Sequence, residues 1–173
     1  MFIPDLTRFS PDHPPSPYNF PLPCRRNDRW GVGQLPPGTV LCAVGWLGDS
    51  VPATGQTPDP CIDTLFNAYV RHATFTDGTA GWHDCEMCSA PEAWYPDGQV
   101  GPIIQWRKQP LRLYGHGHHL IRFQDTVYMC PALILHYILD HDYRPPDEFL
   151  QALPQAVFLT HDDLVWVEYN GSN

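Results

Sequence analysis

Apolar residues recur at helical spacing between residues 59 and 70. Residues 62, 65, 66, 69 and 70 are apolar, and at 3.6 residues per turn they share one face of a helix. Asp59 and Pro60 stand at the start of this segment, as is typical of a helix N-terminus. The pattern predicts an amphipathic helix of about three turns that ends near His72.

Short apolar runs between turn residues predict several strands. Residues 40–47 are almost continuously apolar, which is typical of a buried strand. Alternation and neighbouring turn residues predict further strands over residues 111–114, 120–123, 126–129, 156–159 and 164–169. The last two would pair as a terminal hairpin within residues 154–170. Prolines at positions 131 and 145 predict the starts of two more helices, over residues 131–140 and from residue 145 to about residue 150.

Proline dominates the N-terminal part of the chain. Nine of the first 38 residues are proline, a density that argues against regular structure there. Apolar residues such as Phe2, Phe9 and Trp30 lie between them, so residues 1–38 are expected to form an ordered arm across the core. With 20 prolines and 13 glycines in 173 residues, the expected fold is a single α+β domain of short strands, two to three short helices and long ordered loops.

The charge balance restricts the partners of the protein. Nineteen Asp and Glu residues against 10 Lys and Arg residues give a formal net charge of -9, which opposes binding to the phosphates of nucleic acid. A basic protein partner or a metal ion suits such a surface better. No apolar run approaches the roughly 18 residues of a membrane helix, so no membrane partner is expected.

The six cysteines bear on the compartment. The chain begins Met-Phe-Ile-Pro-Asp, without the basic and apolar regions of a secretion signal. A reducing cytoplasmic location is therefore expected, in which a Cys-x2-Cys pair more often binds metal than forms a disulfide. Four other cysteines are expected to be small core or loop residues: Cys24, Cys42, Cys61 and Cys130.

Two pairs of metal-binding residues carry the main chemical signal. Cys85-x2-Cys88 places two thiolates on a tight turn, and His136-x4-His141 places two imidazoles at the end of a predicted helix. Two sulfurs and two nitrogens match the tetrahedral preference of zinc. Because residues five apart on an ideal helix point about 140° away from each other, the helix must tighten or unwind before His141. The sequence thus predicts a zinc-finger-like knuckle, hairpin and helix over residues 82–141.

The sequence leaves other ligand sets open. His83, two residues before Cys85, is able to replace one of the helix histidines. Four protein ligands would close the coordination shell and make the zinc structural, whereas three would leave a zinc-bound water with Glu86 or Asp84 as its base. A further possible source of ligands is a group that we expect to be exposed turn residues: His116, His118 and His119.

No other catalytic or cofactor-binding motif is present. The chain lacks a nucleophile elbow, a phosphate-binding loop and a dinucleotide fingerprint, so no catalytic residue is predicted. The favoured interpretation is a zinc-stabilised acidic module that binds a basic protein partner, in the manner of an immunity or antitoxin-like inhibitor. The alternative is a zinc-dependent hydrolase with an open coordination position.

Several motifs together resemble a known family. They are Asp5-Leu6, Val44-Gly45-Trp46-Leu47, the Cys85-x2-Cys88 knuckle and His136-Tyr137-x3-His141-x-Tyr143-x-Pro145-Pro146-x-Glu148-Phe149. In these motifs the chain is similar, over roughly residues 5–153, to an uncharacterised family of small bacterial proteins, a domain of unknown function. The resemblance implies that the cysteines and the helix histidines belong to one shared feature, and it implies no activity. The chain departs from the family in a long insertion between Cys88 and Leu111, whose aromatic residues would form either a partner-binding loop or a lid on a small core: Trp94, Tyr95 and Trp106.

Overall fold

The computed structural model describes six segments of the chain, namely residues 2–9, 22–26, 29–71, 85–88, 101–113 and 117–168, with the backbone alone for residues 22–26, 29–32 and 168. These segments form a five-stranded sheet, a three-stranded sheet, a two-stranded hairpin and three α-helices. The predicted α+β class with short strands and short helices is confirmed. None of the helices in these segments is long and apolar enough to cross a membrane.

The largest sheet has the strand order β1–β4–β8–β7–β9. Strands β4 and β8 run parallel, and the other neighbouring pairs run antiparallel. The strands are β1 (Arg8–Phe9), β4 (Val40–Ala43), β8 (Thr126–Pro131), β7 (His118–Phe123) and β9 (Val157–Phe158). The strand predicted over residues 40–47 is thus shorter than expected, although the residues that follow it are still buried.

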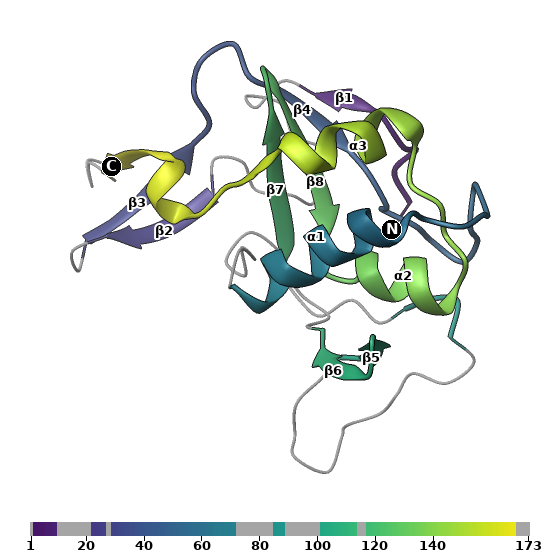
Figure 1. Ribbon diagram of the computed structural model, residues 1–173. Coiled ribbons are helices and arrows are strands. Elements are labelled where there is room, and N and C mark those ends of the chain that lie inside the picture. Colours follow the sequence, from purple (N-terminus) through teal and green to yellow (C-terminus); the bar gives the residue numbers. More distant parts are fainter. Residues whose placement is uncertain are drawn as a thin grey trace.

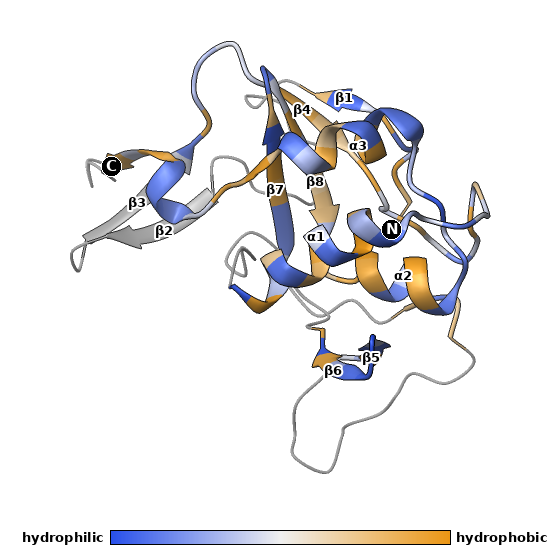
Figure 2. Cartoon of the chain, in the orientation of Figure 1, coloured by the Kyte–Doolittle hydropathy of each residue, from blue (hydrophilic) through white to orange (hydrophobic). Residues whose placement is uncertain are grey.

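Side chains of this sheet alternate between two buried clusters. On one face Cys42, Ile121 and Tyr128 pack with the helices, and on the other face lie Leu120 and Met129. Figure 1 shows the helices over the first face: α1 (Asp59–Val70), α2 (Ile134–Asp140) and α3 (Asp147–Ala152). The second face is covered by residues from outside the sheet: Ile3, Leu35, Trp46, Leu159 and Leu164. The central strands are therefore buried on both sides, and Figure 2 shows apolar residues concentrated in β4, β8 and α2.

The first two helices differ in how well the sequence predicts them. Helix α1 lies where its apolar spacing places it, and it buries Ile62, Leu65 and Phe66. Helix α2 begins three residues later than expected, because Pro131 is the last residue of β8 and pairs with His118. Proline suits a helix start and a strand end alike, since neither position needs its missing N–H.

The predicted terminal hairpin within residues 154–170 is wrong. Strand β9 pairs with β7 in the large sheet, whereas β10 (Val165–Glu168) pairs with β3 (Arg29–Gln34). The two strands therefore lie in different sheets. Between β9 and β10 lies a short 3-10 turn, His161–Asp163, closed by reciprocal hydrogen bonds of Thr160 and Asp163.

Prolines do not prevent regular structure in the N-terminal part. Strand β2 (Leu22–Arg26) pairs with β3, and β1 pairs with β4, so the expectation that residues 1–38 contain no strands is wrong. Pro23 lies in β2, at the edge of its sheet. An edge strand tolerates proline because one side of it needs no N–H donor.

The insertion between Cys88 and Leu111 contributes one hairpin to the described residues. Strands β5 (Ile103–Trp106) and β6 (Gln109–Arg112) pair antiparallel, so the strand predicted over residues 111–114 begins two residues earlier. Ile104 is buried in the helix-side cluster. Trp94 and Tyr95 lie outside the described residues.

Asp5 ties the N-terminal segment to the chain that follows α2. Its carboxylate accepts a hydrogen bond from Gly45 N–H at 2.7 Å and from the hydroxyl of the fully buried Tyr143 at 2.9 and 3.0 Å. Gly45 has a φ of +75°, and a Cβ there would lie 3.2 Å from Cγ1 of Ile134, so this position requires glycine. Burial raises the pKa of Asp5 more than these two hydrogen bonds lower it. Asp5 thus joins three segments, one of which carries His141 two residues before Tyr143.

Two histidines of β7 are buried. His118 and His119 are 1% and 2% exposed, so the expectation that they are exposed turn residues is wrong. Successive residues of a strand point to opposite faces, and both faces of β7 are covered. The ring of His119 meets the rings of Tyr69 and Phe158 edge-on, at centroid distances of 5.2 and 6.4 Å. His116 lies outside the described residues.

The buried ring of His118 predicts a pH-dependent stability. Burial, followed by the positive charges of His119 and His161, lowers the pKa of His118 to about 3, whereas its pKa in an unfolded chain is about 6.5. Between these values the unfolded state binds more protons than the folded state. The stability that depends on the neutral ring is therefore complete above about pH 6.5 and is lost as the pH falls toward about 3.

When the pH is lowered from about 7.5 to about 5.5, we expect the free energy of unfolding to fall by about 1.4 kcal/mol more in the wild-type protein than in His118→Phe. Urea unfolding at each pH measures this difference. Equal pH dependence in His118→Phe and the wild type would contradict the prediction.

Candidate metal centre

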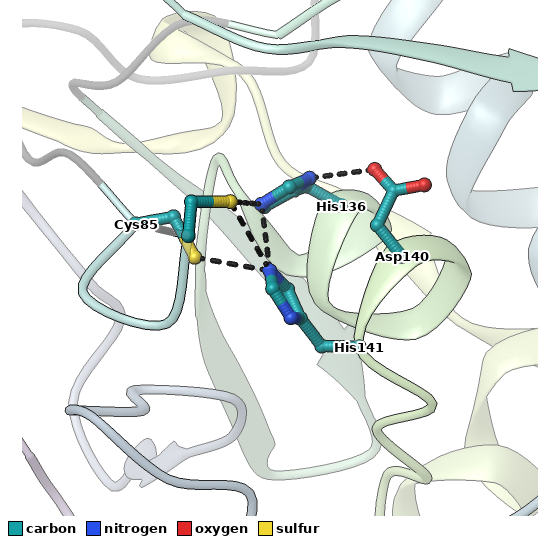
Figure 3. A network of polar contacts seen from close by, with 5 residues as sticks. Cys85, His136, Asp140 and His141 are labelled. Carbon is teal, nitrogen blue, oxygen red and sulfur yellow. Dashed lines mark hydrogen bonds and ion pairs between the residues drawn. The ribbon is translucent and has the colours of Figure 1, made fainter. Parts of the chain in front are cut away.

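The structure brings the four predicted metal ligands together. Cys85 and Cys88 lie on a turn closed by a hydrogen bond from Cys88 N–H to the Cys85 carbonyl at 3.3 Å. His136 lies in α2, and His141 directly follows that helix. One side-chain ligand atom from each of the four residues lies within 4.8 Å of the other three, and Figure 3 shows Cys85, His136 and His141 pointing toward one another.

The separations between ligand atoms fit a small tetrahedral ion. The Nε2 atoms of His136 and His141 lie 3.1 Å apart. Sγ of Cys85 lies 3.2 Å from Nε2 of His141, and Sγ of Cys88 lies 3.4 Å from Nε2 of each histidine. Zinc bonds of about 2.3 Å to sulfur and about 2.0–2.1 Å to nitrogen would separate neighbouring ligand atoms by roughly 3.3–3.8 Å. These four separations are within about 0.4 Å of those values, and since all ligand atoms lie within 4.8 Å of one another, the four residues are able to hold a metal ion after small shifts.

The end of α2 explains how histidines five residues apart reach one point. His141 has a φ of -124° and a ψ of 13°, while its N–H still donates to the Tyr137 carbonyl at 3.2 Å. Asp142 then adopts a φ of 54°, and the N–H of Tyr143 turns back to the same carbonyl at 3.0 Å. The departure from helical geometry that the five-residue spacing requires thus occurs at His141 itself and not before it.

Asp140 orients the ring of His136. Nδ1 of His136 lies 2.7 Å from Oδ2 of Asp140, as Figure 3 shows. A proton on Nδ1 that is donated to this carboxylate leaves the lone pair of Nε2 free for a metal ion. Asp140 is not among the residues predicted from the sequence, although its position four residues after His136 places both on one helix face and is a readable signal.

Removal of the Asp140 carboxylate should weaken metal binding. We expect Asp140→Ala to lower the zinc affinity by roughly 10- to 100-fold, because the His136 ring loses the partner that fixes its tautomer. Competition with a chromophoric chelator measures the affinity. Asp125→Ala, which removes an exposed carboxylate from the β7–β8 turn, should bind zinc like the wild type. A wild-type affinity in Asp140→Ala would show that the carboxylate does not orient the ligand.

The cluster favours the ionisation state that a metal needs at Cys85 and at His141, but not at His136, whose protonated form it stabilises. Burial raises the pKa of Cys85, but hydrogen bonds with His136, Met87 and Cys88 outweigh burial, so that its pKa is lowered toward the thiolate. Burial lowers the pKa of His136, whereas its contacts with Cys85 and Asp140 raise it above the ordinary value. Burial and the charge of His136 lower the pKa of His141, which favours a neutral imidazole. A metal ion would replace the protons that these groups share.

Among the residues that the structure describes, no other candidate ligand joins the cluster. His118 and His119 lie in β7 and are not part of it, and Glu86 is exposed on the knuckle turn. His83 and Asp84 lie outside the described residues. Cys42, Cys61 and Cys130 are buried and form no disulfide, which agrees with their expected place as small core residues.

Comparison with known proteins gives one match. A family model described as "Domain of unknown function (DUF7919)" matches residues 1–154, which agrees with the resemblance seen in the sequence. Neither the curated proteins nor the solved structures contain a match to the chain.

Proposed function

The chain belongs to the DUF7919 family, a domain of unknown function, and from its cysteine–histidine cluster we propose that it is a zinc-stabilised protein-binding module. The observation that carries the zinc assignment is the convergence of two thiols and two imidazoles, whose ligand atoms all lie within 4.8 Å of one another and include four pairs at 3.1–3.4 Å. Soft sulfur and imidazole ligands in a tetrahedral arrangement are the donor set of structural zinc.

Four protein ligands favour a structural zinc over a catalytic one. A tetrahedral ion with four protein ligands has no free position for a reactive water. The two cysteines come from a short turn, and the two histidines come from the end of α2. The proposed zinc therefore joins the knuckle to the helix layer of the core.

Metal analysis and cobalt substitution test this assignment. Purified protein should contain about one zinc per chain, and the cobalt form should show the strong absorption of a tetrahedral site with two thiolates. The cobalt spectrum should not respond to small anions such as azide, because no coordination position is open. An azide-dependent spectrum would instead support the alternative function, a zinc-dependent hydrolase.

We propose a basic protein as the binding partner. The net charge of -9 favours attraction of a basic surface and opposes nucleic acid. Exposed acidic residues stand next to the proposed ligands in the chain, namely Glu86 on the knuckle and Asp140 and Asp142 at the end of α2. Binding of a basic protein through an acidic surface would suit an immunity or antitoxin-like inhibitor.

Co-expression with the product of an adjacent gene tests the partner. We expect a complex that forms at low salt and weakens steeply as the salt concentration rises, because screening reduces the attraction between exposed charges. A complex with unchanged affinity at high salt would contradict the proposed electrostatic recognition.

A further inference from the structure

A surface pocket of about 510 Å3 lies beside the metal centre, between the start of α1, the end of α2 and β5. Its lining includes Leu139 and Asp142, the residues on either side of the segment that carries His141. This volume lies within the range of about 300–1,000 Å3 typical of ligand pockets. The pocket uses side chains that the proposed zinc does not use.

Part of the pocket lining is apolar and includes an aromatic side chain. Ile62 of α1 and Ile138 of α2 are buried there, beside Trp106 of β5. The indole N–H of Trp106 donates a hydrogen bond of 2.8 Å to Oδ1 of Asp63, and the guanidinium of Arg107 lies 5.5 Å from the centre of the indole ring. These contacts fix the aromatic wall before a ligand binds, which lowers the entropy cost of binding.

The rim of the pocket carries an excess of negative charge. Asp59 and Asp142 line it from the starting turn of α1 and from the end of α2, and both are exposed. The guanidinium of Arg107 lies 2.9 Å from the carboxylate of Asp63 but 3.8 Å from that of Asp59. Arg107 therefore forms its ion pair mainly with Asp63. Arg144, whose side chain lies against Gly55 of the lining, is paired with Asp147 at 2.7 Å. The described lining residues themselves include the carboxylates of Asp59 and Asp142 and no lysine or arginine, so the rim favours a bound cation.

We infer that this pocket receives an arginine side chain of the partner protein. The inference rests on the proposed binding of a basic protein and names the part of that protein that makes the central contact. The aliphatic stem of an arginine would pack against Ile62 and Ile138, while its guanidinium would lie between the carboxylates of Asp59 and Asp142. A planar guanidinium is also suited to an aromatic wall such as Trp106.

Peptide titration of the zinc-loaded full-length protein tests the inference. The probe is the tripeptide amide N-acetyl-Gly-Arg-Gly, and its control is the same peptide with citrulline, which keeps the shape of arginine but carries no charge. The readout is the nuclear magnetic resonance of the Trp106 indole N–H and of the backbone around Asp142. We expect the arginine peptide to shift these resonances, and the citrulline peptide to bind about tenfold more weakly.

Two variants with equal changes of charge separate the pocket from general attraction. Asp142→Asn should lower the affinity for the arginine peptide by about five- to tenfold. Asparagine is well tolerated at the positive φ of this residue. Asp125→Asn, in the β7–β8 turn, should bind the peptide like the wild type. Cobalt spectra of both variants must match the wild type, so that the metal centre is intact. Equal weakening in both variants, or shifts that map away from Trp106, would overturn the inference.

The partner complex distinguishes failure of the pocket from failure of the proposed function. If a basic partner protein forms a salt-sensitive complex of equal affinity with the wild type and with the Asp59→Asn, Asp142→Asn double variant, the pocket inference is wrong while the proposed function stands. If the peptide binds as expected but no basic protein forms a complex, the function is wrong and the arginine pocket stands.

Discussion

Cys88→Ala is expected to abolish stoichiometric zinc binding and to lower the midpoint of thermal unfolding by roughly 10–20 °C. The substitution removes a sulfur that approaches both histidines at 3.4 Å. The remaining three ligands would hold zinc weakly, and the binding free energy that stabilises the fold would be lost. Calorimetry with metal analysis of the same sample measures both effects, and chelation of zinc from the wild type should give a similar decrease.

Cys61→Ala is the matched control for this prediction. Cys61 is buried, whereas Cys88 is half-buried, and Cys61 lies in α1 outside the metal cluster with its thiol 3.6 Å from the Leu150 carbonyl. We expect this variant to retain one zinc and to lose only about 1 kcal/mol of stability. If chelated wild type melts no earlier than the zinc-loaded protein, the proposed structural zinc is wrong.

Asp5→Ala is expected to lower the free energy of unfolding by about 2–4 kcal/mol. The substitution leaves the Gly45 N–H and the buried Tyr143 hydroxyl without the carboxylate that now accepts from both. Loss of a partner inside a protein costs more than loss of one at the surface, because water does not replace it. Denaturant unfolding at neutral pH measures the change.

Asp5→Asn separates hydrogen bonding from charge at this position. Asparagine keeps one oxygen to accept from Gly45 N–H and retains a polar contact with Tyr143. We expect Asp5→Asn to cost clearly less than Asp5→Ala, and Asp49→Ala, at an exposed position, to cost less than about 0.5 kcal/mol. Equal losses in the two Asp5 variants would point to the negative charge itself.

Local sequence patterns predicted the parts of the fold that depend on local interactions. The apolar spacing of α1 and the turn between β7 and β8 are both short-range features, and both occur as expected. The metal cluster was also predictable, because each of its two ligand pairs is a short motif: Cys85-x2-Cys88 and His136-x4-His141. Only the convergence of the two pairs is a long-range property, and the chemistry of zinc was sufficient to suggest it.

The errors concern long-range contacts. Strands β9 and β10 are neighbours in sequence, yet their partners are β7 and β3. No local pattern identifies those partners. His118 and His119 have the polarity of surface residues, and only the cover on both faces of β7 makes them buried. The role of Asp5 was likewise hidden, since its partners Gly45 and Tyr143 lie 40 and 138 residues away.

The separation of the ligand pairs along the chain has a consequence for folding. Cys85 and His141 are 56 residues apart, and Cys88 and His136 are 48 residues apart. In an unfolded chain, closing loops of this length costs conformational entropy, so the cysteine pair alone would capture zinc only weakly. Tight binding requires that the β7–β8 hairpin and α2 have already assembled, and zinc affinity would therefore report how far the native topology has formed.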